Sequence, residues 1–314
     1  MENFLLYLEG EKRDIKTIQA YRANLECFVK NVLNDDKNVD NSIYDSLTVE
    51  DLMDWLEKIK EDRISKGKSE PSASTLNQRI STIKKFYNYL CGIRLAKTNI
   101  AQGISQIKNN EIHQTVVLEE REVVSLVNRA KEKTYEFDKG FKRYVAFRDE
   151  MIINLFLCTG LRISELSSID MNDINLVTRE LKVVGKRNKK RVVAIPKSKM
   201  LMLENYIRLR NELKSSSLDD ALFLSRQKGE NGYRLGNNQI RNIVVELAKE
   251  SNVKKITPHS LRHTGATLQI KNGADLIDVS KWLGHSSLAI TEQIYVHQTN
   301  TSAHKVAELF DGMF

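Results

Sequence analysis

Tyr295 is a side chain whose setting in the sequence suggests chemistry. It stands in HSSLAITEQIYVH (285–297), ten residues after His285 and two before His297. A free tyrosine has a pKa of about 10, so at neutral pH it attacks as a nucleophile only with a base or strong cations beside it. The same stretch is also compatible with a tyrosine that packs in a core. Other parts of the sequence have to decide between the two interpretations.

A second stretch, TPHSLRHTGATL (257–268), predicts the start of a helix. Thr257 suits an N-cap and Pro258 suits the first helical position. His259 and Arg262 then lie on one face of the first turn. Because a helix N-terminus offers unpaired N–H groups and partial positive charge, these two side chains would complete a phosphate cradle. The spacing alone is common and is weak evidence.

The same stretch also invites a zinc interpretation, because His259 and His263 are four residues apart, as in the HExxH proteases. However, position 260 is Ser260, and the catalytic glutamate of that motif is missing, which disfavours a metal site. No GxSxG elbow occurs, so a nucleophilic serine is unsupported as well.

Two further stretches supply cations. In CTGLRISEL, Gly160 ends an apolar helix and Arg162 precedes the next one. An arginine at such a junction is more often a salt-bridge partner, here of Glu165, than a catalyst.

The strand-like runs 181–184 and 192–195 flank GKRNKKR, in which five of seven residues are basic, and predict a hairpin with a cationic tip. Taken alone, such a tip is more often a solvated loop.

Length and composition indicate a globular chain of two domains, since 314 residues exceed one ordinary core. No apolar run approaches the length that a bilayer requires, and no charged and then apolar leader is present, so we expect a cytoplasmic protein with no membrane partner. The three cysteines are scattered and odd in number. They are expected to be reduced core residues rather than disulfides or metal ligands.

The distribution of charge is more informative than the net value of +8. Residues 1–57 hold 6 Lys/Arg against 13 Asp/Glu, whereas residues 58–105 hold 10 against 3. Residues 106–314 carry 33 basic and 25 acidic side chains, which accounts for the whole excess. A basic surface spread over two regions is what a clamp on DNA would need.

Helical periodicity dominates the first hundred residues. Apolar residues recur at spacings of three and four in ENFLLYLEGEK, TIQAYRANLECFVKNVL, LTVEDLMDWLEKIKE and SASTLNQRISTIKKFYNYLCG. Thr48 and Asp51 form a capping-box pattern, and Gly92 is placed to close the fourth helix. Beyond a polar stretch, helix and strand patterns mix. The expected organisation is a helical domain at 1–105, a linker at 106–117, a catalytic domain at 118–300 and a tail at 301–314.

These stretches together closely resemble the tyrosine recombinases, the family of phage integrases and Xer-type site-specific recombinases. GLRISEL, the GK of the hairpin, HSLRHT, LGHSS and IYVH follow one another in the family's order. KTIQAYRANLECFV and STLNQRISTIKKFYNYL are similar to two helices of its core-DNA-binding domain, and LAKTNIAQGI to the segment that leads out of it. The resemblance implies a mainly α fold with a small β-sheet. A helical SAM-like domain and an α+β catalytic domain would form a C-shaped clamp on DNA.

The resemblance also implies a role for each motif residue. Tyr295 would attack a DNA phosphodiester, leaving a 3′-phosphotyrosine and a free 5′-hydroxyl. Arg162 and Arg262 would neutralise the charge that grows on the non-bridging oxygens. Each such group is typically worth about 2 to 4 kcal/mol of barrier, by analogy with an oxyanion-hole donor.

Three more residues complete the expected set. Lys186 would give a proton to the leaving 5′-oxygen, with its pKa lowered by neighbouring cations. His259 would accept the tyrosine proton, and His285 would bond a non-bridging oxygen. No metal and no cofactor are expected, because the arginines stabilise the charge and the phosphotyrosine stores the bond energy.

The implied partner is double-stranded DNA with paired inverted sites, bound by a homo-tetramer, with an accessory ATPase or directionality factor left open. The candidate DNA contacts are Lys16, Arg22, Arg79, Lys84 and Lys85 in the first domain and Arg187, Lys189 and Lys190 in the hairpin. The tail has an apolar face, Val306, Leu309 and Phe310, that would dock either on a neighbouring protomer or on its own domain.

Two other functions stay open beside recombination. A type IB topoisomerase would use similar chemistry without pairing sites, and an accessory DNA-binding protein would lack a catalytic residue. The role of a recombinase also stays open between integration or excision of a mobile element and dimer resolution. In one respect the chain departs from the family: the interval from His285 to Tyr295 is one residue longer than usual. An extra helical residue would rotate Tyr295 by about 100°, so we expect the SSLAI loop to absorb it.

Overall fold

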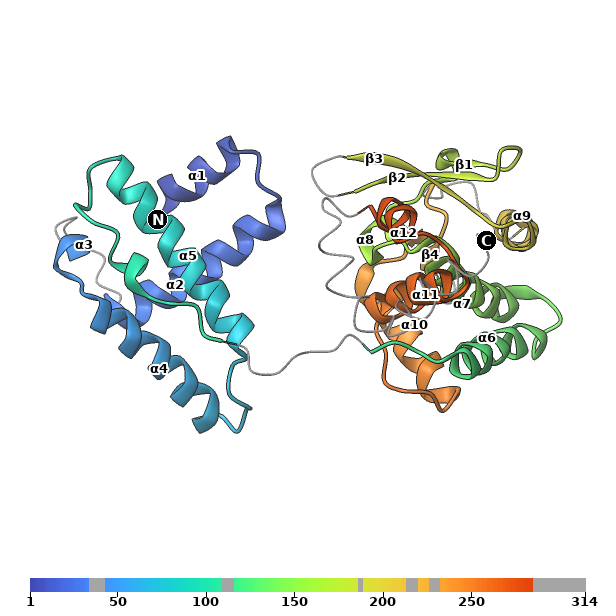
Figure 1. Ribbon diagram of the computed structural model, residues 1–314, viewed down its shortest axis with the longest axis horizontal. Coiled ribbons are helices and arrows are strands. Elements are labelled where there is room, and N and C mark those ends of the chain that lie inside the picture. Colours follow the sequence, from blue (N-terminus) through green and yellow to red (C-terminus); the bar gives the residue numbers. More distant parts are fainter. Residues whose placement is uncertain (34–42, 109–115, 186–188, 213–219, 226–231, 285–314) are drawn as a thin grey trace, which may run out of the picture. The chain divides into compact units, whose positions relative to one another are not determined.

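The structure is a computed structural model that describes residues 1–33, 43–108, 116–185, 189–212, 220–225 and 232–284. The chain divides into two compact units, Met1–His113 and Gln114–Phe314. Figure 1 shows that the first unit is built of helices and that the strands all lie in the second. No helix in these described ranges is long and apolar enough to cross a membrane.

The first unit contains the four helices that periodicity predicts. They are α1 (Glu2–Gly10), α2 (Ile15–Val32), α4 (Val49–Ser65) and α5 (Ala73–Gly92), with the short α3 (Ile43–Ser46) and a 3-10 turn at Ile100–Gly103. The predicted capping box is confirmed: the backbone N–H of Asp51 donates to Thr48 Oγ1 (3.3 Å), and that of Thr48 donates to the Asp51 carboxylate (2.8 Å).

The end of α5 differs from the expectation. Gly92 is the last helical residue but does not adopt the left-handed conformation, which falls instead on Arg94 with a φ of 59°. The chain leaves the helix through Ile93, whose N–H still reaches the carbonyl of Tyr89 at 3.1 Å. Gly92 thus ends the helix without supplying the left-handed residue, which lies two positions later at Arg94.

Aromatic side chains form much of the first core. Phe28 and Trp55 meet edge to face with ring centroids 5.3 Å apart, as do Phe4 and Phe86. All four are at most 2% exposed. Edge-to-face pairs of this kind add to the stabilisation that their burial provides. They join α1, α2, α4 and α5 into one core.

The second unit is mainly helical with two small antiparallel sheets. Its helices are α6 (Glu120–Tyr135), α7 (Gly140–Thr159), α8 (Ile163–Ser167), α9 (Lys197–Glu212), α10 (Asn237–Glu250), α11 (Pro258–Lys271) and α12 (Leu276–Leu283), with a 3-10 turn at Met171–Asp173. Its strands are β1 (Ile174–Asn175), β2 (Glu180–Val184), β3 (Lys190–Ala194), β4 (Leu224–Ser225) and β5 (Tyr233–Arg234). The order in the larger sheet is β1-β2-β3.

Helix α7 lies at the centre of this unit and packs on α6, α9 and α11. Its middle residues from Met151 to Phe156 are all buried, as the apolar run RDEMIINLFLCTG predicts. Helix α11 passes close beside it at Gly265, where a Cβ atom would overlap the carbonyl oxygen of Leu157. Only glycine permits that approach.

The predicted hairpin is confirmed by the pairing of β2 with β3, in a register that sets Val183 opposite Arg191 and Val184 opposite Lys190. The N–H of Gly185 donates to the carbonyl of Lys189 at 2.8 Å and closes the base of the loop. The cysteines Cys27, Cys91 and Cys158 are free. They pack at the edges of the cores and are only partly buried.

Candidate active site

Arg162 lies at the junction of α7 and α8. Gly160 ends α7 in the left-handed conformation, with a φ of 59°, and a Cβ at this position would overlap the ring of Trp282. Glycine is thus required both by the backbone and by the close tryptophan. Arg162 follows as the N-cap of α8, with its side chain 37% exposed. The tight turn fixes the backbone position from which the Arg162 side chain extends.

Arg262 lies in α11, just after the predicted helix start. Thr257 is the N-cap, as expected, and its hydroxyl accepts a hydrogen bond from the N–H of Ser260 at 3.3 Å. Arg262 is 1% exposed. Its Nη1 donates to the carbonyl of Gly160 at 2.5 Å, so α11 is tied directly to the turn that precedes Arg162.

The two arginines meet at the C-terminal end of α12. Arg162 Nη2 donates to the carbonyl of Gly284 at 3.2 Å, and Arg262 Nη2 donates to that of Leu283 at 2.6 Å. Carbonyl groups at a helix C-terminus lack partners within the helix and carry partial negative charge, which guanidinium groups neutralise. The residue after Gly284 is His285, so both arginines hold the point from which the chain continues to His285 and Tyr295.

Glu165 provides the negative charge between them and is 1% exposed. It accepts the backbone N–H of Arg162 at 2.7 Å and its Nη1 at 3.0 Å, and it lies 4.0 Å from Arg262 Nη1. Burial alone would raise the pKa of Glu165, but hydrogen bonds from Arg191 and from the Arg162 backbone outweigh it and lower the pKa. The expected pairing of Arg162 with Glu165 is confirmed.

Arg191 also belongs to the site, although no sequence motif singles it out. Its Nη1 and Nη2 donate to the two oxygens of Glu165 at 2.5 and 3.0 Å, a bidentate pair. The alternation of side chains along the strand could have indicated it: Arg191 is two residues before Val193, which is buried, and so lies on the same face of β3. An arginine on the buried face of a strand needs an anion close by.

His259 lies in the first turn of α11, and its Nε2 is 2.9 Å from Nε2 of His263. The two rings are nearly perpendicular, at 86°. Desolvation of the ring, followed by the charges of Arg262 and Arg162, lowers the pKa of His259 below its ordinary value, although the residue as a whole is exposed. His259 is therefore held near both arginines in a mainly neutral form at pH 7.

Several expected site residues fall outside the described ranges. They are Lys186, Arg187, His285 and Tyr295, together with the tail residues Val306, Leu309 and Phe310. The extra residue between His285 and Tyr295 also falls there. The described part of the site consists of Arg162, Glu165, Arg191, His259 and Arg262.

The candidate DNA contacts differ in how they are engaged. Lys189 and Lys190 at the hairpin base and Lys16 at the start of α2 are exposed. Arg22 forms two hydrogen bonds with Glu2, at 2.7 and 3.0 Å, and both side chains are well exposed. Such a surface pair is weak, and it leaves Arg22 available to exchange its partner.

Three candidates on α5 have partners within the first unit. Arg79 Nη1 is 3.0 Å from the sulfur of Cys27, and its guanidinium group lies over the Trp55 ring. The other two are lysines: Lys84 Nζ donates to the carbonyl of Ile104 at 2.7 Å, and Lys85 Nζ donates to Glu11 at 2.7 Å.

The segment that leaves the first unit is also held on α5. Asn77 donates from Nδ2 to the carbonyl of Ile107 at 2.9 Å and accepts its N–H at 2.8 Å. Together with the Lys84 bond, this attaches residues 104–107 to the helix. The helix thus holds the chain as far as Ile107, within the stretch 106–117 that is expected to be the linker.

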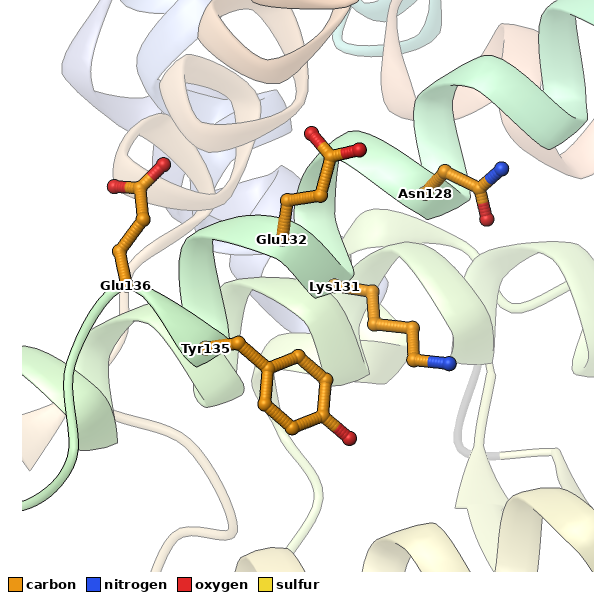
Figure 2. A pocket seen from close by; sticks show the side chains of 5 residues that line it. All are labelled: Asn128, Lys131, Glu132, Tyr135 and Glu136. Atoms are coloured by element: carbon orange, nitrogen blue, oxygen red, sulfur yellow. The ribbon is translucent and has the colours of Figure 1, made fainter.

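A shallow hollow on α6 does not contain any of the expected site residues. It is lined by Asn128, Lys131, Glu132, Tyr135 and Glu136. Figure 2 shows the Lys131 and Tyr135 side chains extending to one side of the helix and the carboxylates of Glu132 and Glu136 to the other. Because α6 and the residue that follows it supply every side chain, the hollow lacks the convergent groups of a binding site. Among the described residues, none cluster in groups of three or more suited to a metal ion.

Comparisons with known proteins identify the family of the chain. Residues 116–302 match the family model described as Phage integrase family, and residues 1–92 match Phage integrase, N-terminal SAM-like domain. The tyrosine recombinase XerC of Thermodesulfovibrio yellowstonii is 31% identical, over 94% of this chain and 90% of its own length. XerD of Staphylococcus epidermidis is 30% identical, over 99% and 97%.

Solved structures share the fold. The XerH site-specific recombinase bound to palindromic difH substrate superposes with a TM-score of 0.67 at 21% identity, covering 94% of this chain and 80% of that one. A lambda integrase dimer bound to a COC′ core site gives 0.65 at 16% identity, covering 92% and 94%. The chain belongs to the phage integrase family. It is a tyrosine recombinase, an enzyme of DNA breakage and rejoining that acts in site-specific recombination.

Proposed function

We propose that this enzyme cleaves DNA through Tyr295, forms a 3′-phosphotyrosine, and rejoins the strand to a new 5′-hydroxyl. The observation that supports this most directly is the meeting of Arg162 and Arg262 at Leu283 and Gly284, next to His285. Two guanidinium groups from separate helices converge where the chain enters the motif that carries the tyrosine. Such forks suit the non-bridging oxygens of a phosphate.

The described residues then have definite tasks. Arg162 and Arg262 neutralise the charge that develops on the phosphate, and loss of either is expected to slow cleavage about 100- to 1000-fold. His259, kept neutral by its surroundings, accepts the tyrosine proton. Lys186 on the hairpin protonates the leaving oxygen, and His285 bonds the phosphate. The hairpin is attached to the arginines through Arg191 and Glu165.

The partner is double-stranded DNA with paired inverted sites, bound by four copies of the chain. A lambda integrase tetramer bound to a Holliday junction, with a TM-score of 0.65 and 15% identity, shares this fold and gives a precedent for such an assembly. The similarity to XerC and XerD over nearly the whole length favours chromosome dimer resolution in the cytoplasm as the biological role. Inverted repeats at the ends of a mobile element around the gene would instead indicate integration and excision.

A covalent-trapping experiment tests the nucleophile. The wild-type protein, incubated with a nicked substrate of its own site, is expected to form an adduct that survives denaturing electrophoresis. Tyr295→Phe should abolish the adduct while DNA binding is retained. Tyr233→Phe is a matched control, because Tyr233 is 68% exposed in the same unit, and it should leave the adduct unchanged. An adduct that persists in Tyr295→Phe would overturn the proposal.

The same preparation separates recombination from topoisomerase activity. Exchange between two plasmid-borne sites is expected, and a plasmid without the site should keep its supercoils. Relaxation of that plasmid, without exchange between sites, would indicate a type IB topoisomerase.

A further inference from the structure

We propose that His263 is a positioning residue that holds His259 in the neutral tautomer whose Nδ1 is free to accept a proton. The inference rests on the proposed function, in which His259 accepts the tyrosine proton. It begins from the close contact of the two imidazoles, with Nε2 of His259 2.9 Å from Nε2 of His263. His263 is 1% exposed and has no role in the chemistry described so far.

The contact fixes the number of protons between the rings. Two Nε2–H groups facing each other would clash, and two bare nitrogens would repel, so at 2.9 Å the pair shares a single proton. One histidine donates from Nε2, and the other accepts at Nε2 and carries its own proton on Nδ1. The direction of this bond decides the chemistry that remains available to His259.

Base catalysis requires that His259 be the donor. When Nε2 of His259 carries the proton, its Nδ1 keeps a free lone pair, and the tyrosine proton can go there. The reverse direction would place the proton on Nδ1 and turn His259 into a hydrogen-bond donor only. His263 would thus play the part of the group that orients the histidine of a Ser-His-Asp triad, but as a neutral acceptor.

The location of the pair favours this arrangement. His259 is in the first turn of α11, where backbone N–H groups point outward and favour an acceptor over a donor. The charges that bear on it are those of Arg262 on its own helix and Arg162 at the start of α8, and they disfavour a second proton on the ring. A buried histidine one turn further along α11 fixes the ring without adding charge.

A spectroscopic measurement tests the tautomer directly. In long-range 1H–15N spectra of the full-length wild-type protein at pH 7, His259 is expected to carry its proton on Nε2. His263→Leu removes the acceptor and should give a mixture of tautomers or the Nδ1–H form. His263→Gln presents an amide oxygen near the position of Nε2 and should restore the wild-type tautomer. A wild-type His259 protonated on Nδ1 would overturn the proposal, as would a tautomer unaffected by His263→Leu.

Cleavage of the nicked substrate gives the second readout. His263→Leu is expected to slow adduct formation on the order of 10- to 100-fold, and His263→Gln to recover most of that loss. In a His259→Leu background, His263→Leu should slow cleavage no further, because its effect passes through His259. An additional loss there would overturn the proposal. If His263→Leu fails to fold, the tautomer of His259 in the wild-type protein and in His263→Gln still tests the proposal.

The two readouts keep this proposal separate from the proposed function. If wild-type protein formed no adduct at all while the tautomer responded to His263 as described, the nucleophile assignment would fail but the positioning role would stand. If the adduct formed and the tautomer did not respond, only the role of His263 would fail.

Discussion

Arg191 and Glu165 form a bidentate ion pair, 2.5 and 3.0 Å in length, that ties the hairpin strand β3 to the first turn of α8. Glu165 is 1% exposed and Arg191 is 16% exposed at its side chain. The carboxylate also bonds Arg162 and lies 4.0 Å from Arg262. One buried anion thus holds three cations in place, and two of them are the arginines expected to bind the scissile phosphate.

Because one carboxylate faces three arginines, we expect the loss of Glu165 to reduce stability more than the loss of Arg191 does. Glu165→Leu leaves three arginines without a buried counter-charge and is expected to cost about 3 to 5 kcal/mol of unfolding free energy. Arg191→Met should cost less, because Glu165 keeps Arg162 and Arg262 as neighbours. Urea unfolding monitored by circular dichroism measures the unfolding free energy of both variants.

An exposed pair in the same unit provides the control. Asp278 and Lys281 on α12 are each 74% exposed at the side chain, so Asp278→Asn is expected to change stability little. A larger loss for Arg191→Met than for Glu165→Leu would contradict the arrangement of charges described above.

The same carboxylate predicts a pH dependence. The pKa of Glu165 in the folded chain lies below its ordinary value of 4.5, because the bonds from Arg191 and Arg162 outweigh burial. The unfolded chain therefore binds the proton first on acidification. The stabilisation is complete above pH 4.5 and is lost as the pH falls through the lower folded pKa.

Urea unfolding at a series of acidic pH values checks this sign. The wild-type protein is expected to lose stability more steeply below pH 4.5 than Glu165→Gln, which has no proton to bind. The difference between the two curves isolates Glu165 from the other carboxylates, which titrate in both proteins. Parallel curves would show that the pKa of Glu165 is the same in the folded and the unfolded chain.

Much of this site could be inferred from the sequence. The turn at Gly160, the cap at Thr257 and the hairpin follow from local rules of helix termination and strand alternation, and all three are confirmed. The pairing of Arg162 with Glu165 spans only three residues, within the reach of one helical turn.

The contacts that the sequence did not reveal are those between distant segments. Arg162 reaches Gly284 across 122 residues, and Arg191 reaches Glu165 across 26. Periodicity shows which face of an element is buried, but it does not show which element packs against that face. The capping interactions at Leu283 and Gly284 depend on tertiary packing in the same way.

Gly284 allows a third prediction, because both its conformation and its surroundings require glycine. Its φ is 64°, and a Cβ there would lie 3.0 Å from Arg191 Nη1. Gly284→Ala is expected to cost about 1 to 2 kcal/mol from the left-handed backbone. It should also shift the Arg191 guanidinium group by a few tenths of an ångström against its pair with Glu165 and slow adduct formation about 10-fold, since 1.4 kcal/mol of lost positioning corresponds to that factor.

Gly273, in the turn between α11 and α12, is a matched control. It has a φ of 91°, also in the left-handed region, but nothing lies within 4 Å of a Cβ at that position. Gly273→Ala should therefore lose similar stability while cleavage of the nicked substrate stays close to the wild-type rate. Equal cleavage defects in the two variants would mean that backbone strain, and not the displacement of Arg191, causes the loss.

The base of the hairpin gives the last prediction, which concerns DNA binding. Lys189 precedes β3 and Lys190 is its first residue, next to Arg191. Both lysines are exposed, and we expect them to contact the phosphate backbone. Each phosphate contact releases condensed counterions, and the slope of log K against log salt concentration changes by about 0.9 per contact. The double variant Lys189→Ala, Lys190→Ala should therefore reduce that slope by about 1.8 and weaken binding to all sequences alike.

Lys281→Ala is the control: it removes one positive charge from a 74% exposed side chain on α12 and should leave the slope nearly unchanged. Fluorescence anisotropy titrations over a range of salt concentrations measure both slopes, and an equal slope for the wild type and the double variant would exclude the hairpin base from the DNA interface.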